Sequence, residues 1–435
     1  MVFDDTTEPT DIWHAYGFLS FFIDRLCWLC NQINMPGPIT IATEPTRKLD
    51  TQAEVQLLRA AVQQNPSSES LRLRLARLLN KLDMFSESIE LLCEDTAAND
   101  NLGAKFALIA AYFARNTADD NALAKMIAEN AVSLVQSDAD RSHLLSELAK
   151  AHLRLGQNNA ALPLLHKALE LNPVNVNAFK RLALELLHQN QPQQVITLTD
   201  RLKQQGANHS RLLAARMMAY AALGEAQSAQ QLLGASEFIY AAQIETPSGW
   251  PDLSAFNAAL ASEISSNRGM RFERYGTSSE KAWRVDHPAT GNTPAVSALL
   301  AEIARIAESH AASCAEYDHD WPNACPQTAI LRSWCVMTEG DGFEKWHMHP
   351  EGWMSGGYYV EVPDAVVNGA NEAGCLAFGV PGGLIGEAAA RNVVETQVRP
   401  TPGLLTLFPS HAYHRTFTHN NHGRRMCIAF DICPS

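Results

Sequence analysis

Charged residues are scarce in this 435-residue chain, and positive charge is the scarcer kind. Lys and Arg number 34 against 47 Asp and Glu, which gives a formal net charge of −13. This balance argues against a nucleic-acid backbone as the main partner, although it leaves room for a local basic groove. Because 46% of the residues are apolar, the chain can bury sizeable cores and is not a disordered protein.

Cysteine is also sparse. The nine cysteines are scattered and odd in number, so no disulfide framework is visible, which fits a reducing cytoplasm. Cys27 and Cys30 form a C-x-x-C, but no second pair lies nearby. We interpret the two as small apolar residues on a helix rather than as a zinc or redox site.

The sequence lacks a clean hydrophobic run of membrane-spanning length. Its most apolar stretch, residues 12–33, is interrupted by Asp24 and Arg25 and shows no secretory cleavage pattern. We expect residues 1–50 to form an N-terminal extension that includes a docking helix. A second interpretation stays open, in which Met35 is an ordinary start and the first 34 residues are an upstream extension.

Helical repeats occupy residues 51–238. Apolar residues recur at spacings of three and four, as on one face of a helix. The clearest unit, LLSELAKAHLRLGQNNAALPLLHKALELNPVN, resembles the 34-residue tetratricopeptide repeat. No helix pair buries its apolar face alone, so we expect about five units to stack into a right-handed α-solenoid. The units lie at 71–94, 108–135, 144–175, 178–202 and 212–234.

In the C-terminal part, residues 239–435, the spacing of apolar residues changes to every second position. The change follows a Pro- and Gly-containing boundary at 244–257. Two helices are expected first, around 252–266 and 293–317. Short strand-like runs then alternate with Pro and Gly, which is typical of an antiparallel barrel or jelly roll. The fold class is therefore α+β and multidomain. The expected strands are 328–337, 355–362, 374–379, 392–398, 403–408, 412–418 and 425–432.

Three residues with metal-binding side chains alternate in KWHMHPEGWMSGGYYVEVP, just before a predicted strand. Side chains at i and i+2 of an extended segment point the same way, so either His347 with His349 or His349 with Glu351 can hold one ion. A mononuclear Fe(II) that activates O₂ needs three protein ligands on one face. The third ligand must come from a distant strand, and His414, which follows GLLTLFPS, suits that role.

Four ordered motifs carry a family resemblance. HMHPEGWMSGGYYVEVP, GCLAFGVP, PTPGLLTLFPSHAYHRTF and RRMCIAFDI make the chain similar to the 2-oxoglutarate/Fe(II)-dependent dioxygenases, and most similar to a bacterial and phage branch. The resemblance covers roughly residues 328–432. It implies a double-stranded β-helix with flanking helices, and Fe(II) and 2-oxoglutarate as cofactors. The preceding repeats also give it the architecture of the aspartyl/asparaginyl β-hydroxylases.

The resemblance implies roles for individual residues. Arg425 falls on the arginine that binds the far carboxylate of 2-oxoglutarate, a role for which a planar guanidinium is suited. In RMCIAF, bulky residues alternate with Arg425, Cys427 and Ala429, which leaves room for a ligand on the arginine side. Tyr358 or Ser355 is expected to give this co-substrate a second hydrogen bond.

The metal triad is left with two main solutions, because the superfamily's usual H-x-D is absent. His347 and His349 fall on the first metal motif and His414 on the distal histidine, so we favour these three. The alternative is His349, Glu351 and His414, an H-x-E arrangement. A site with two histidines and water completing the face is the remaining possibility.

These assignments imply a dioxygenase that hydroxylates its substrate with O₂ and releases succinate and CO₂. Concave helical arrays bind extended chains, so we expect a protein or peptide side chain that the repeats recruit. One alternative is a small-molecule substrate, with the repeats serving for docking or for a homodimer. Another is a repeat scaffold whose β domain is inactive, which the joint presence of the histidines and Arg425 disfavours. We expect a cytoplasmic protein without a nucleic-acid partner or a membrane span.

Overall fold

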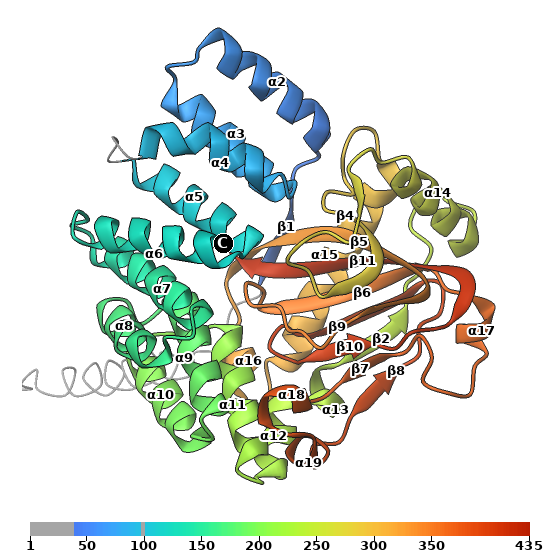
Figure 1. Ribbon diagram of the computed structural model, residues 1–435. Coiled ribbons are helices and arrows are strands. Elements are labelled where there is room, and N and C mark those ends of the chain that lie inside the picture. The colour runs from blue at the N-terminus through green and yellow to red at the C-terminus, as the bar shows by residue number, and fades with distance from the viewer. Residues whose placement is uncertain (1–38, 97–100) are drawn as a thin grey trace, which may run out of the picture.

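The computed structural model describes residues 39–96 and 101–435. A helical array forms one side of the molecule and antiparallel sheets form the other (Figure 1). The expected fold class, helical repeats followed by a jelly-roll domain with flanking helices, is confirmed. The expected docking helix and the Cys27–Cys30 pair lie outside the described residues. No helix in the described ranges is long and apolar enough to cross a membrane.

The array consists of helix pairs that follow a single first helix. In the unit expected at 144–175, Ala149, Ala161 and Ala168 are fully buried, so the two helices approach closely. Gly156, at a φ of 71°, makes the turn between them. The helices are α2 (Thr51–Gln64), α3 (Glu69–Lys81), α4 (Phe85–Thr96), α5 (Leu102–Arg115), α6 (Ala118–Val132), α7 (Asp138–Arg154), α8 (Asn158–Leu171), α9 (Val176–His188), α10 (Pro192–Gln204), α11 (Ser210–Ala222) and α12 (Ala226–Leu233).

Two sheets make up the β part. The larger has the strand order β2-β9-β6-β11-β5-β4-β3, with β1 beside β5, and the smaller has the order β10-β7-β8. All seven expected strands are present, as β5 to β11. The strands are β1 (Thr40–Thr43), β2 (Tyr240–Gln243), β3 (Met270–Phe272), β4 (Ser279–Val285), β5 (Thr328–Glu344), β6 (Met354–Glu361), β7 (Leu376–Phe378), β8 (Thr396–Val398), β9 (Leu404–Pro409), β10 (His414–Thr416) and β11 (Asn421–Pro434).

Two short strands that the sequence did not predict attach the array to the larger sheet. Strand β1, which precedes the array, pairs in parallel with the start of β5. Strand β2, which follows the array and the short helix α13 (Ala235–Phe238), pairs with β9. Residues 40–43 therefore hydrogen-bond into the same sheet as the C-terminal strands. We propose that the jelly-roll domain includes β1 and that the array is inserted between β1 and β2.

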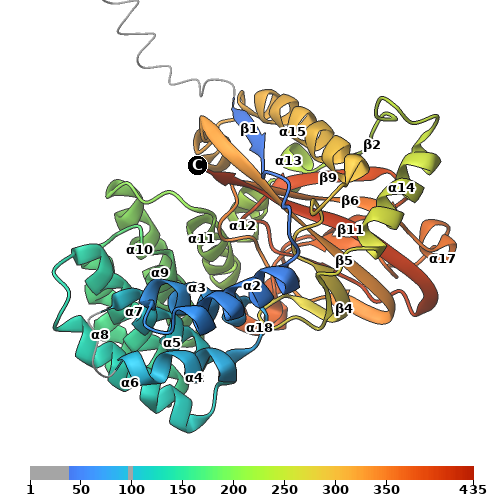
Figure 2. The ribbon, with the colours of Figure 1, turned by 90° about the horizontal axis from the view of Figure 1, so that it is seen from above.

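Two helices cover one face of the larger sheet, and the array lies toward the other face (Figure 2). Helices α14 (Leu253–Ser265) and α15 (Pro294–Cys314) pack their apolar sides on alternate residues of the central strands. In β11, Met426, Ile428 and Phe430 belong to this core. Because strand side chains alternate, the residues between them face the array. The remaining short helices are α16 (Asp320–Asn323), α17 (Asp364–Val367), α18 (Gly382–Ile385) and α19 (Glu387–Ala390).

Gly356 is expected to be essential for the packing of the central strands. A Cβ atom there would lie 2.2 Å from the Thr406 carbonyl oxygen and 2.4 Å from the Phe430 ring, both of which are held in the sheet. Gly356→Ala should lower the unfolding free energy by about 1–3 kcal/mol or more. Thermal unfolding measures this loss. Gly383→Ala is the control, because nothing lies within 4 Å of its Cβ position; equal melting temperatures for the two variants would contradict the prediction.

Candidate metal centre

The segments that carry the histidines are hydrogen-bonded to each other. The backbone N–H of His347 donates to the carbonyl of His414, and the reverse bond has the same length, 2.9 Å. The N–H of His349 donates to the carbonyl of Ser410 over 3.0 Å. This short antiparallel bridge fixes the early motif beside the start of β10. His347 and His414, which are 67 positions apart in the chain, are thus held side by side before any metal binds.

Three imidazole rings converge at this bridge. One ligand atom from each of His347, His349 and His414 lies within 4.8 Å of the others. Each Nδ1 has a partner of its own: the Lys345 carbonyl, the Asp431 carboxylate and the Ala412 carbonyl, respectively. These partners set the Nδ1–H tautomer and leave the Nε2 lone pairs for an ion. The Nε2 atoms of His349 and His414 are 3.2 Å apart.

Burial keeps two of these rings, those of His347 and His414, in the form that binds metal. It lowers the pKa of His347 to about 4, and it lowers the pKa of His414 well below its usual value, an effect to which the neighbouring histidines add. A neutral imidazole is the form that coordinates a divalent cation. The rings of His347 and His414 are therefore ready to act as ligands at neutral pH.

Asp431, which sequence reasoning missed, supports His349. Its carboxylate lies 2.7 Å from His349 Nδ1 and accepts a hydrogen bond of 2.7 Å from the Ser355 hydroxyl. Histidine ligands commonly donate to such a carboxylate, which fixes the ring and raises its basicity. The sequence did contain a signal for Asp431. It lies six residues after Arg425, and residues an even number apart on a strand lie on the same face, here the cavity side of β11.

The structure does not bring Glu351 to the histidine cluster. Its side chain is 73% exposed and pairs with Arg332 over 3.0 Å at the surface. Ser355 is fully buried, but its hydroxyl is bonded to Asp431 and Ser410. Ser355 thus bonds to residues behind the histidine cluster and is not among the residues that line the cavity.

Arg425 lies in the cavity and Arg424 does not. Arg425 is 5% exposed, and its Nε has no hydrogen-bond partner among the described residues. Arg424 points to the other side, where its Nη2 donates to Glu361 over 2.8 Å. The tyrosine beside Arg425 is Tyr359, whose hydroxyl accepts from its Nη2 over 3.4 Å.

Tyr358, one of the two residues expected to contact the co-substrate, lies on the opposite face of β6. Its hydroxyl donates to Asn257 of α14 over 2.6 Å, inside the core. The period of two explains the difference, since neighbouring residues of a strand point to opposite faces. The sequence SGGYY offered two tyrosines, and the structure places the second one in the cavity.

One comparison with known proteins covers the part of the chain that carries this site. Residues 332–431, which contain the three histidines and Arg425, match the family model described as "Putative 2OG-Fe(II) oxygenase". The C-terminal domain belongs to this oxygenase family. Its cofactors are Fe(II) and 2-oxoglutarate, and the residues fit both. Three clustered imidazoles suit Fe(II), and the unpartnered Nε of Arg425 suits a carboxylate.

The solved structures that are similar to parts of this chain include prolyl hydroxylases and tetratricopeptide-repeat proteins. One is a Pseudomonas putida prolyl-4-hydroxylase, with 14% identity over 46% of this chain and 95% of that chain and a TM-score of 0.31. A Trichoplax adhaerens prolyl hydroxylase, in complex with a hypoxia-inducible-factor peptide, has 11% identity, coverages of 48% and 91%, and a TM-score of 0.31. The tetratricopeptide protein YrrB has 17% identity, coverages of 41% and 90%, and a TM-score of 0.31. No curated protein matches the sequence significantly.

The cavity of the oxygenase domain is closed on one side by the repeats. It has a volume of about 830 Å³ and is lined by the three histidines and Arg425, and also by Lys180 of α9 and Arg211 of α11. Residues of the same two helices line a second, small pocket together with Met348 and Tyr413, which are sequence neighbours of the candidate ligands. The Ser210 hydroxyl at the start of α11 donates to the Gly352 carbonyl over 2.6 Å. The repeats are therefore part of the site.

Proposed function

We propose that the protein is an Fe(II)- and 2-oxoglutarate-dependent hydroxylase that acts on a side chain of a polypeptide held against its helical repeats. The overall reaction takes substrate C–H, O₂ and 2-oxoglutarate to substrate C–OH, succinate and CO₂. The observation that carries the proposal is the shared wall, because α9 and α11 line the same cavity as the metal-site histidines. A chain lying along the inner helices would thereby reach the metal.

Each group of residues has a defined task in this proposal. Bound Fe(II) and 2-oxoglutarate would supply the activation of O₂. His347, His349 and His414 would hold the metal, and Arg425 would bind the distal carboxylate through charge-assisted hydrogen bonds. Burial raises the pKa of the Tyr359 hydroxyl, so it stays protonated and can donate to the same carboxylate. Thr406 and Phe408 complete the wall on the side of β9.

Arg425→Ala is expected to weaken 2-oxoglutarate binding by at least about tenfold, because it removes a buried charged donor. Anaerobic titration of the Fe(II)-loaded protein measures this. The wild type should develop a weak metal-to-ligand absorption band in the green, and the Arg425→Ala variant should lack it at the same concentration.

Arg424→Ala is the matched control for this titration. It removes the same charge from the adjacent residue, but that side chain pairs with Glu361 outside the cavity. The control should keep the band and the formation of succinate. A wild-type protein with neither band nor succinate would refute the proposed function.

A further inference from the structure

A second cavity adjoins the metal cavity. Its volume is about 1050 Å³, and it lies between helices α2 and α3 and the strands β3, β4 and β5. We call the two cavities together the basic groove, which runs from Arg47 and Lys81 past Arg274 and Arg284 to Lys180 and Arg211 beside the histidines. The cavities are continuous because they share lining residues: Arg274, Arg284, Trp334, Glu351 and Asp431.

Positive charge is concentrated in the basic groove. Ten Lys or Arg side chains line the upper cavity and four more line only the metal cavity, against seven carboxylates in all. The whole chain carries a net charge of −13, so this excess opposes the general trend. Asp286 contributes little free negative charge, because Arg271, Arg274 and Arg284 surround it. The groove therefore attracts anions even though the protein as a whole is acidic.

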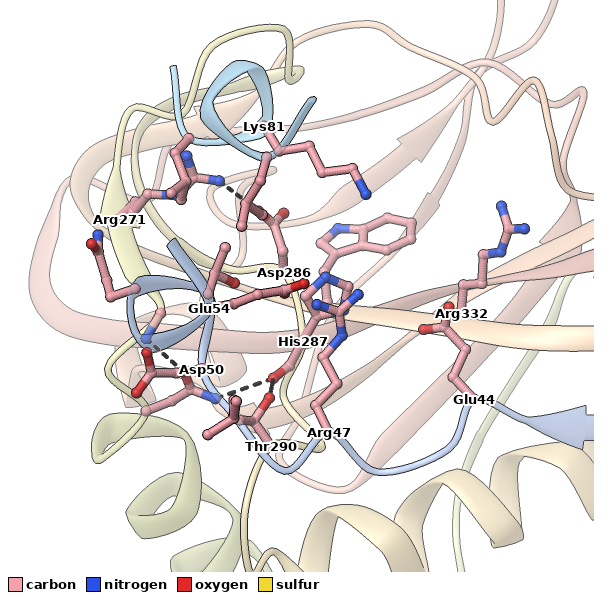
Figure 3. Close-up of a pocket in the computed structure, with 18 of the residues that line it drawn as sticks. Glu44, Arg47, Asp50, Glu54, Lys81, Arg271, Asp286, His287, Thr290 and Arg332 are labelled. Carbon is pink, nitrogen blue, oxygen red and sulfur yellow. Dashed lines mark hydrogen bonds and ion pairs between the residues drawn. The ribbon is translucent and has the colours of Figure 1, made fainter. Parts of the chain in front are cut away.

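Several of these cations have no carboxylate partner. Within the described residues, no acidic group lies within ion-pair distance of Arg47 or Lys81, and both extend toward the middle of the upper cavity (Figure 3). Burial and the charge of Arg47 lower the pKa of the neighbouring His287 to about 4. At the metal end, the Nε of Arg211 is buried without a hydrogen-bond partner. An unpaired buried donor of this kind is expected to meet a ligand.

The shape and chemistry of the basic groove favour a polypeptide over a nucleic acid. Helix α3 borders one end of the groove, and helices α9 and α11 border the other end. A single ligand that reaches from one end to the other must therefore be extended. Trp334 is the only Phe, Tyr or Trp among the described residues that line the upper cavity, and the Arg284 guanidinium already covers its ring at 4.8 Å. No platform is left there for stacked bases.

We propose that the basic groove binds an acidic segment of a polypeptide and that this segment carries the residue presented to the metal site. The carboxylates of the segment would pair with Arg47, Lys81 and the cations that follow toward the histidines. The inference has two halves. The binding half, that the groove holds an acidic segment, rests on the groove alone. The presentation half, that this segment carries the residue presented to the metal site, rests on the proposed function.

Fluorescence anisotropy with the full-length protein tests the inference. The probes are a labelled peptide in which glutamate alternates with glycine, the same peptide with glutamine, and a single-stranded oligonucleotide. The acidic peptide should bind best, and more weakly as salt rises. Arg47→Gln with Lys81→Gln should weaken its binding by about fivefold or more. The control, Lys167→Gln with Arg305→Gln, removes two cations outside the groove and should change binding by less than about twofold.

The outcomes separate this inference from the proposed function. Equal binding of the glutamate and glutamine peptides, tighter binding of the oligonucleotide, or unchanged binding by the Arg47/Lys81 variant would each overturn the inference. The 2-oxoglutarate absorption band should persist in that variant, because neither residue lines the metal cavity. A missing band in the wild type would instead overturn the proposed function and the presentation half, whatever the peptide result.

Discussion

His347→Ala is expected to lose its iron, whereas Glu351→Ala keeps the iron content of the wild type. His347 lies within the cluster of three histidines, and the Glu351 side chain is mostly exposed and paired with Arg332. Loss of a ligand should lower iron affinity by more than the roughly 10–100-fold that follows loss of an outer-shell partner. Iron content after anaerobic loading and desalting measures the difference.

His422→Ala, which removes an exposed histidine of β11, is the control for surface metal binding. Circular dichroism should show that all three variants are folded. Retained iron in His347→Ala together with lost iron in Glu351→Ala would establish the H-x-E triad instead of the three-histidine site.

Asp431→Asn is expected to lower the affinity for Fe(II) by about 10–100-fold. The asparagine keeps the size of the side chain but removes the negative charge that faces His349 Nδ1 at 2.7 Å. The ring would then be a weaker donor to the metal, and its tautomer would be less well fixed. Anaerobic Fe(II) titration, followed by competition with a chelator, gives the two affinities.

Asp341→Asn provides the comparison, because Asp341 pairs with Lys281 at the surface and contacts none of the histidines. Its Fe(II) affinity should equal that of the wild type. If Asp431→Asn also binds Fe(II) as the wild type does, the carboxylate does not support the ligand.

Much of the metal site follows from local patterns in the sequence. The alternation of His347 and His349, and the strand that begins with His414, predicted a cluster that the structure brings together. The alternation in β11 also indicated that Arg425, and not Arg424, faces the ligand side. These features can be predicted from the sequence because side chains alternate between the two faces of a strand, so a few residues are enough to show which ones share a face.

Other parts of the site depend on long-range packing, which no local pattern reports. Tyr358 and Tyr359 are equivalent in sequence, and only the register of β6 against the core decides which one enters the cavity. The four-residue strands β1 and β2 are too short to show a period. Lys180 and Arg211 occupy ordinary helix positions in the sequence, and only the packing of the array against the oxygenase domain brings them to the cavity.

The pairing of β1 with β5 and of β2 with β9 has a practical consequence for dissecting the protein. A truncation that starts after the repeats would also remove β1 and leave residues 328–331 of β5 as an open edge, which invites aggregation. An internal deletion that joins β1 to β2 through a flexible linker would keep the sheet intact. Because both ends of the solenoid are joined to the same sheet, bending of the array, rather than rotation of the whole array, is the motion that would change the width of the basic groove.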